Sequence, residues 1–335
     1  MQGYRLSSRY ILAGLFLTGF IALTSCQSAV DKATPTAPPT ATPTSVPEQA
    51  TVTPGLPVQI VEVGSNDSLG SPHDIVVSGG YAYVADSFAG LRVVDVNDPA
   101  DPRQVGVLEP GGSARGQGVT YADPYLYFAD GLGLLVVNVS DPTSPAEMGF
   151  YDSPGLAVKA QVSGGFAYVA GREGGLSIAD LSDPADPQHV SNYFKAGSVH
   201  VLDVCVSGSY AYVAMEGNGL RIVDVSDPAN PQEVGFLDTA GDTEAVVASG
   251  AYAYLADGSE GLRIVDVSDP ADPQEAGFYD TPGYAQDVAL VGRYALVGDG
   301  VSRLLLAIDV SNPANPQLAA CRRGQTFPQT RLMVN

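Results

Sequence analysis

The stretch GLRIVDVSDPANPQE, residues 219–233, occurs in six versions along the chain. The turn residue before its first proline is Asp98, Asp141, Asp183, Asp227, Asp269 or Asn312, at intervals of 42 to 44 residues. The last version, from residue 303, matches least well. A period of this size, rich in β-branched residues and tyrosine and without helical periodicity, predicts an all-β fold. In that fold each repeat forms one blade of a β-propeller.

Each repeat contains four short apolar segments, seen most clearly in EVGFLDT, EAVVASG, YAYLAD and GLRIVDVSDP between Glu233 and Pro270. The residues between them are mainly Gly, Asp and Pro, which turn an extended chain. We therefore predict a four-stranded antiparallel meander for each repeat. The GLRIVD strand is apolar on both sides of its pleat, so both faces of the sheet are expected to be covered by neighbouring blades.

The number of blades depends on how the ring closes. Six repeats favour six blades, and an incomplete seven-blade ring is the alternative. PVQIVEVG, residues 57–64, aligns with an outer strand and can complete the last blade, while PQLAAC, residues 316–321, is a second candidate for that place. We assign residues 57–321 to the propeller. Residues 322–335 leave the repeat and are interpreted as an irregular tail.

The amino-terminal region has the features of an export signal. In residues 1–25, Arg5 and Arg9 precede the apolar run YILAGLFLTGFIALTS. The sequence LTSC that ends at Cys26 resembles the lipobox of bacterial lipoproteins, which implies a lipid on Cys26. Residues 26–56 are rich in Thr, Pro and Ala and predict a disordered stalk. We expect an extracytoplasmic protein that is lipid-anchored to the cell membrane or cell surface; an uncleaved membrane anchor is the alternative.

The phrase GLRIVDVSDP, preceded by YAYVAD and followed by PQEVG, resembles the LVIVD repeat family of bacterial and archaeal surface or exported proteins. The resemblance covers about residues 57 to 320. It implies a β-propeller and a role as a surface or interaction module. The family has no common catalytic motif to transfer.

Composition and motifs narrow the class of function. The chain has 16 basic and 37 acidic residues, and a net charge of −21 repels phosphate backbones, so nucleic acid is not an expected partner. No GxSxG or HExxH motif occurs in the sequence. We therefore expect a monomeric protein that is not an enzyme and has no cofactor. We predict no disulfide between Cys205 and Cys321.

A polar side chain recurs in every repeat, at Asp95, Asn138, Asp180, Asp224, Asp266 and Asp309 in the GLRIVD strand. A residue that recurs in each blade serves the fold more often than a ligand. We interpret these side chains as acceptors for backbone N–H groups of neighbouring turns.

Function is expected where the repeat varies. The loops that enter each innermost strand, and the loops between the second and third strands, emerge on one face around the channel mouth. The candidate ligand-binding residues of this face are His73, Asp74, Gln117, Lys159, Arg172, His200, Asp203, Glu244, Asp257 and Asp287.

These residues support two hypotheses about function. The first is a surface-displayed module that binds or scaffolds protein or cell-envelope polymer partners. The alternative is an exported metal-assisted hydrolase or lyase with its site at the mouth, because nitrogen and oxygen ligands suit a divalent ion. The metal candidates are His73, Asp74, His200 and Asp203, although they lack the local spacing of known metal motifs.

Overall fold

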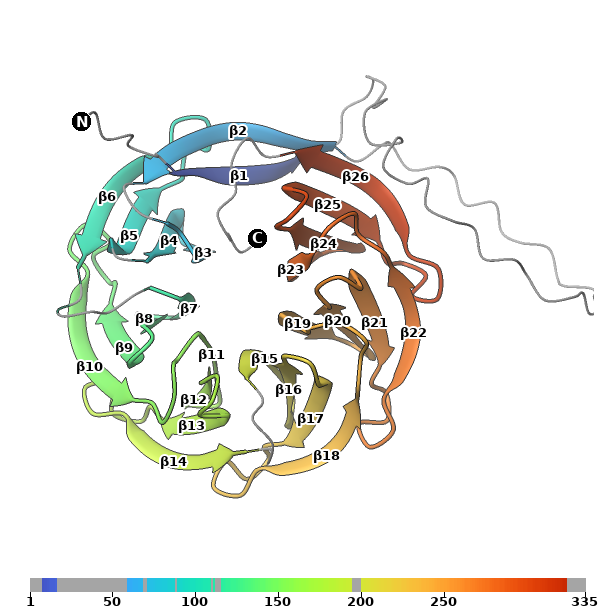
Figure 1. Cartoon of the computed structure of the whole chain (residues 1–335). Helices are drawn as coiled ribbons and strands as arrows, with labels where there is room; N and C mark the ends of the chain where they lie inside the picture. Colours follow the sequence, from blue (N-terminus) through green and yellow to red (C-terminus); the bar gives the residue numbers. More distant parts are fainter. Residues whose placement is uncertain are drawn as a thin grey trace, which may run out of the picture.

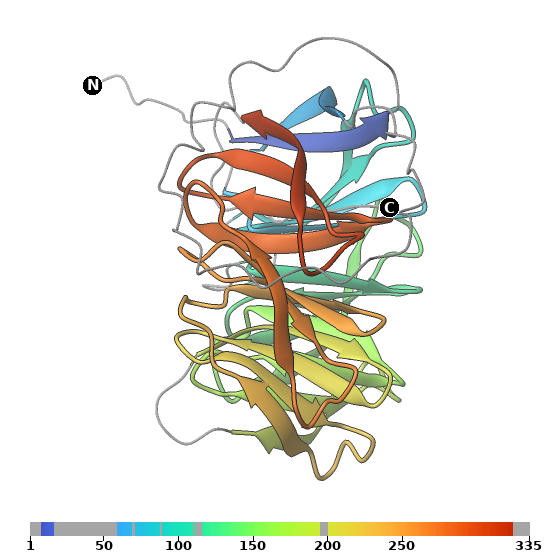
Figure 2. The same cartoon turned by 90° about the vertical axis from the view of Figure 1, so that its right-hand side faces the viewer.

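The computed structural model describes residues 8–16, 59–68, 71–87, 89–109, 111, 116–194 and 200–323. Within them the chain forms six four-stranded antiparallel blades arranged in a ring and no helix, as the repeat predicts (Figure 1). Seen from the side, the strands run across the thickness of the ring (Figure 2). Because no helix is present in this part of the chain, none is long and apolar enough to cross a membrane.

The blades follow one another in chain order. Blades 1 to 3 are β3 (Asp74–Ser78), β4 (Tyr81–Asp86), β5 (Gly90–Asp95) and β6 (Arg103–Leu108); β7 (Gly118–Ala122), β8 (Tyr125–Ala129), β9 (Gly133–Asn138) and β10 (Ala146–Asp152); and β11 (Lys159–Ser163), β12 (Phe166–Ala170), β13 (Leu176–Asp180) and β14 (Gln188–Tyr193). Blades 4 to 6 are β15 (Val201–Ser207), β16 (Tyr210–Met215), β17 (Gly219–Asp224) and β18 (Gln232–Leu237); β19 (Ala245–Ser249), β20 (Tyr252–Ala256), β21 (Leu262–Asp266) and β22 (Gln274–Tyr279); and β23 (Ala285–Val291), β24 (Tyr294–Asp299), β25 (Leu304–Asp309) and β26 (Gln317–Arg323).

Each blade is a meander that starts with its innermost strand and ends with its outermost strand (Figure 1). The pairing of the third with the outer strand shifts by one residue in every blade, for example between Ile222 and Val223. Such a bulge bends and twists a strand. The long outer strands therefore curve along the circumference of the ring.

The tight turns after the third strand are held by the recurring acids. Asp224 Oδ1 accepts the N–H of Ser226 at 2.8 Å, and Asp227 Oδ1 accepts the N–H of Ala229 at 3.1 Å. The same pattern follows Asp95, Asn138, Asp180, Asp266 and Asp309. The interpretation of these residues as fold-forming acceptors is confirmed.

Neighbouring blades share apolar clusters. Tyr212 and Leu220 of blade 4 pack with Val246 and Leu255 of blade 5, while Val213 on the opposite face packs toward blade 3. Equivalent clusters join blades 1 and 2, 2 and 3, and 5 and 6. The double-sided apolar pattern of the sequence thus corresponds to burial on both faces of the blade.

A glycine in the outer strand lets the next blade approach closely. A Cβ on Gly235 would lie 2.1 Å from the carbonyl oxygen of Pro270, which belongs to the Asp-Pro turn of the following blade. Gly106, Gly149 and Gly277 meet the equivalent carbonyls of their neighbours. In blade 3 the residue is Ser191, and its Oγ donates a hydrogen bond to the carbonyl of Pro228 at 2.6 Å.

The junction between blades 6 and 1 is built differently. Blade 6 has a second apolar cluster on the face that points away from blade 5. It includes Leu305 and Ala320, and Ile60 of β2 (Gln59–Ser68) packs against it. Blade 1 has a separate small cluster around Ile75 and Val84. Figure 1 shows β2 and β1 (Ser8–Phe16) at the outer side of the ring between these two blades.

One expectation about the chain ends differs from the structure. PVQIVEVG does not complete the last blade: β26, which contains PQLAAC, is its outer strand, and β2 pairs antiparallel with β1 instead. The reason is continuity, since β26 follows β25 through the turn at Asn312, which corresponds to the Asp-Pro turns of the other blades. Ser8–Phe16 lies within the segment interpreted as an export signal and forms β1, a strand outside the six blades; the export signal stays a prediction. The stalk and the tail from residue 324 fall outside the described residues.

The close approach at Gly235 yields a first prediction. Gly235→Ala should lower the free energy of unfolding by about 1–3 kcal/mol, because the added methyl group meets a backbone carbonyl that cannot move without shifting the next blade. Gly111→Ala is the matched control, since nothing lies within 4 Å of a Cβ at that position. Urea unfolding of both variants measures the difference. Equal midpoints would contradict a tight contact between blades.

Candidate binding site at the channel mouth

The loops that enter the innermost strands surround a cavity of about 170 Å³ at one end of the channel. Six candidate residues line it: His73, Gln117, Lys159, Arg172, Glu244 and Asp287. Val158, Leu202, Ala245 and Gln286, from the same loops and strand starts, complete the lining. Below the mouth the channel widens into a space of about 360 Å³ between the innermost strands of the six blades.

Asp74 and Asp203 are buried beneath this lining and connect adjacent blades. Asp203 Oδ1 accepts the N–H of Val204 at 2.9 Å, and its Oδ2 accepts the N–H of Val246, in the next blade, at 3.1 Å. Asp74 makes the equivalent pair of bonds across blades 1 and 2. Both were candidate ligand residues, but these bonds give them a role in joining innermost strands.

Blade 3 supplies both cations of the mouth. Lys159 Nζ lies 3.6 Å from Asp74 Oδ2 in a largely buried ion pair. The backbone of Arg172 is fixed by two hydrogen bonds with Val201, 3.1 Å from its N–H and 3.2 Å to its carbonyl. The Arg172 side chain is therefore carried by a loop that is tied to the next blade.

An acidic group on the opposite part of the lining has an altered pKa. Burial raises the pKa of Glu244, partly offset by a hydrogen bond of 2.9 Å that its Oε1 accepts from the Tyr284 hydroxyl. Tyr284 also donates to Asp242 at 3.2 Å, and burial together with Glu244 raises the pKa of this phenol. For the imidazole of His73, burial acts in the opposite direction: it lowers the pKa and favours the neutral form. The sequence did not point to Tyr284, because it precedes the innermost strand by one residue and has no counterpart in other repeats.

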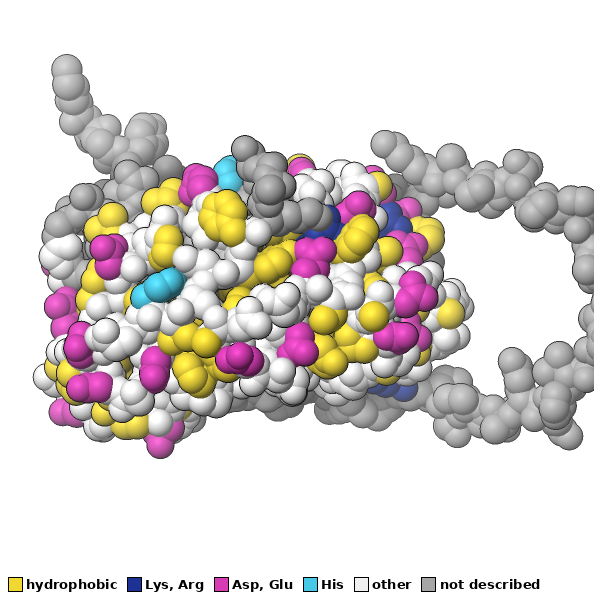
Figure 3. Space-filling view, turned by 90° about the horizontal axis from the view of Figure 1, so that it is seen from below, with side chains coloured by type: hydrophobic (Ala, Val, Ile, Leu, Met, Phe, Trp, Pro, Cys, Tyr) yellow, Lys and Arg dark blue, Asp and Glu magenta, His cyan; other side chains and the backbone are white. Residues whose placement is uncertain are grey.

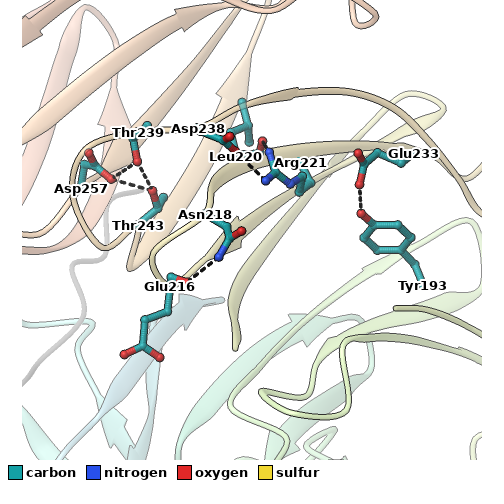
Figure 4. Close-up of polar contacts among 10 residues, drawn as sticks. All are labelled: Tyr193, Glu216, Asn218, Leu220, Arg221, Glu233, Asp238, Thr239, Thr243 and Asp257. Atoms are coloured by element: carbon teal, nitrogen blue, oxygen red, sulfur yellow. Dashed lines mark hydrogen bonds and ion pairs between the residues drawn. The ribbon is translucent and has the colours of Figure 1, made fainter. Parts of the chain in front are cut away.

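Two candidate residues lie elsewhere. His200 is outside the cavity lining, where its Nδ1 is 2.5 Å from Glu216 Oε2 and its Nε2 is 3.7 Å from Glu173 Oε1. Asp257 is fully buried and accepts hydrogen bonds from the hydroxyls of Thr239 and Thr243, at 2.7 and 2.6 Å, and from the N–H of Gly241 (Figure 4). Asp257 therefore organises the loop before β19 and does not face the cavity.

The metal hypothesis gains no support from this geometry. Nowhere in the described residues do three or more His, Cys, Asp or Glu side chains come together in a group that could hold a metal ion. His73 lines the mouth, whereas His200 is engaged by Glu173 and Glu216.

The cysteines are placed as follows. Cys205 is not in a disulfide, as expected, and its Sγ accepts the N–H of Ala248 in the next blade at 3.3 Å. Cys321 is disulfide-bonded, and its partner is outside the described residues. Cys26, the predicted lipidation site, is outside them as well.

Comparison with known families gives a match over each blade. The LVIVD repeat matches residues 69–108, 111–153, 154–194, 198–239, 240–281 and 282–321. The chain belongs to the LVIVD repeat family. These six LVIVD repeats coincide with the six blades, so the unit of sequence is also the unit of structure. No curated protein sequence matches the chain.

Several solved structures share the propeller fold of these LVIVD repeats. A functionally unknown protein from Desulfotomaculum acetoxidans is 15% identical, with a TM-score of 0.65 over 78% of this chain and 87% of that one. The periplasmic gluconolactonase PpgL of Pseudomonas aeruginosa is 13% identical, with a TM-score of 0.64 over 78% and 90%. The β-propeller domain of Cps50 (Swd1) from Myceliophteria thermophila is 12% identical, with a TM-score of 0.63 over 78% and 88%. At these identities the likeness concerns the fold alone.

The bonds of Asp203 give a second prediction. Asp203→Ala should lower the free energy of unfolding by about 2 kcal/mol or more, because two buried N–H groups lose their acceptor and each such loss costs about 1–3 kcal/mol. Asp152→Ala, at an exposed aspartate, is the control and should have little effect. Chemical unfolding of the two variants decides whether Asp203 joins the blades.

The pKa of Glu244 gives a third prediction. A carboxyl group whose pKa is raised in the folded protein favours folding while it is protonated, and this contribution is lost as the pH rises through the folded pKa. Glu244→Gln removes the charge and keeps an acceptor for Tyr284. The stability of Glu244→Gln relative to the native chain should therefore increase from pH 4 to pH 7 in unfolding experiments. A difference that is independent of pH would contradict burial of this carboxyl group.

Proposed function

We propose that this protein is a non-catalytic binding module that presents the channel mouth to a protein or cell-envelope polymer outside the cytoplasm. One observation carries the proposal: a nearly invariant ring of blades supports a polar cavity whose lining residues differ from blade to blade. A rigid scaffold with variable polar loops is the usual arrangement of a recognition surface. The module acts as a monomer and needs no cofactor.

The rest of the surface suits an exposed setting. Figure 3 shows one side of the ring, where Asp and Glu side chains are scattered between hydrophobic ones. Exposed aromatic residues of the outer strands include Phe150, Phe236 and Phe278, and Arg221 and Arg263 stack over the last two at 4.6 Å. The stacking covers one face of each ring, so these aromatics do not by themselves suggest a partner.

The binding proposal is tested by blocking the mouth. Gln117→Arg places a long charged side chain in the cavity, and Gln232→Arg is the control on the exposed outer strand of blade 4. The full chain, immobilised, is exposed to envelope extract, and captured proteins and polymers are identified by mass spectrometry and sugar analysis. Capture should fall at least tenfold in Gln117→Arg and stay unchanged in Gln232→Arg. Equal capture by both variants, or turnover of a captured molecule, would overturn the proposal.

We further propose that the chain is exported and anchored by lipid on Cys26, on the strength of the apolar run and the LTSC sequence. Cleavage before Cys26 would remove β1, so β2 would lose its hydrogen-bonded partner in the mature protein.

A bacterial host that processes lipoproteins tests the anchor. The native chain should appear in the membrane fraction with a mass increase for three acyl chains or two, and Cys26→Ser should be unlipidated and leave that fraction. The same mass measurement shows whether the Cys26 thiol forms a disulfide instead. Native chain that keeps residues 1–25 and carries no lipid would contradict the anchor.

A further inference from the structure

Blade 3 departs from the other five blades at two positions of the mouth. Lys159 begins its innermost strand, where the strand pairing places Asp74, Gly118, Asp203, Ala245 and Asp287 in the other blades. Arg172 follows its second strand, where the other blades have Ser87, Gly131, Glu216, Gly258 and Gly300. Blade 3 therefore places two positive charges where no other blade has a lysine or arginine.

The backbone at Arg172 is unfavourable for a residue with a side chain. Its φ is 44°, in the left-handed region that favours glycine, and the equivalent Gly131 and Gly258 have φ of 83° and 55°. The two hydrogen bonds with Val201 hold this conformation. Strain of this kind is concentrated at functional positions, so the side chain of Arg172 is the feature to explain.

The charge of Arg172 is available to a ligand. Arg172 lines the cavity and makes no ion pair with a carboxylate of the described residues, although its charge acts at longer range to offset part of the rise that burial causes in the pKa of Glu244. Lys159 lines the same cavity but is partly neutralised by Asp74. An arginine fork and an ammonium group that line one cavity are suited to a carboxylate or a phosphate.

The remaining lining selects between these two anions. Glu244 and Asp287 face the same cavity and repel a doubly charged phosphate more strongly than a singly charged carboxylate. Gln117, Gln286 and Asp287 offer donors and acceptors for hydroxyl groups. The volume of about 170 Å³ is below that of drug-sized pockets and suits one sugar residue. The net charge of −21 opposes the approach of any polyanion, so binding here depends on short-range contacts with the two cations, while salt screens the repulsion beyond about 8 Å.

We propose that Lys159 and Arg172 bind the carboxylate of a uronic acid residue in an acidic polysaccharide, with the sugar hydroxyls on Gln117, Gln286 and Asp287. This inference rests on the proposed binding function and specifies its ligand. The ring positions the two cations from one blade, while blades 2 and 6 contribute the hydroxyl-binding side chains.

D-Glucuronate is the probe, titrated into the full chain and followed by calorimetry. Arg172→Gly should weaken its binding at least tenfold, the loss expected for a charge-assisted hydrogen bond, while the unfolding midpoint stays the same or rises. Lys159→Gln should also weaken binding. Arg303→Gly is the matched control: Arg303 has a φ of 57°, in the same left-handed region as Arg172, and lies outside the cavity lining. It should gain the same stability and keep the affinity.

The outcomes are distinct. D-Glucose binding as tightly as D-glucuronate, inorganic phosphate binding more tightly, or full affinity in Arg172→Gly would each overturn the assignment. If D-glucuronate does not bind but capture from envelope extract still depends on Gln117, this inference fails and the proposed function stands. If the mouth captures nothing, both fail.

Discussion

The structure depends on the burial of both faces of every blade. A single four-stranded sheet whose third strand is apolar on both sides would expose one of its faces, so it is stable only between two neighbours. Shared apolar clusters supply this burial at five junctions. Asp74 and Asp203 add directional bonds between innermost strands. As a result, the loops at the mouth start from strands that are fixed from both sides, and their side chains converge on one cavity.

The junction between blades 6 and 1 lacks two features that join the other blades. Blades 6 and 1 share no apolar cluster among the described residues, and blade 6 packs against Ile60 of β2 instead. Its outer strand has Ala320 where the pairing puts Gly235 in blade 4. The glycine that admits the Asp-Pro turn of the next blade is thus replaced by alanine at the junction where blade 6 packs against β2. Sequence and geometry change together at the end of the array.

Periodicity made most of the fold predictable, because each blade repeats the same turns and the same double-sided apolar strands. It also located the loop residues of the mouth, since each innermost strand begins 16 to 20 residues after the preceding turn residue. It could not choose between PVQIVEVG and PQLAAC for the last outer strand, because both fit the pattern of that strand. Nor could it separate Asp257 from the cavity residues: Thr239 and Thr243 convert Asp257 into a loop acceptor, and those threonines lie outside the repeated motif.

In a repeat protein, departures from the repeat are informative only when the structure shows what they face. Arg172 and Arg303 both have a positive φ, of 44° and 57°, so both have a backbone conformation that is uncommon for residues other than glycine. Of these two arginines only Arg172 lines the mouth, and the same cavity is lined by a second cation that is also specific to blade 3. Strain alone therefore does not identify a site. Strain combined with a cavity and an available charge does, and that combination distinguishes blade 3 from the five blades that share its architecture.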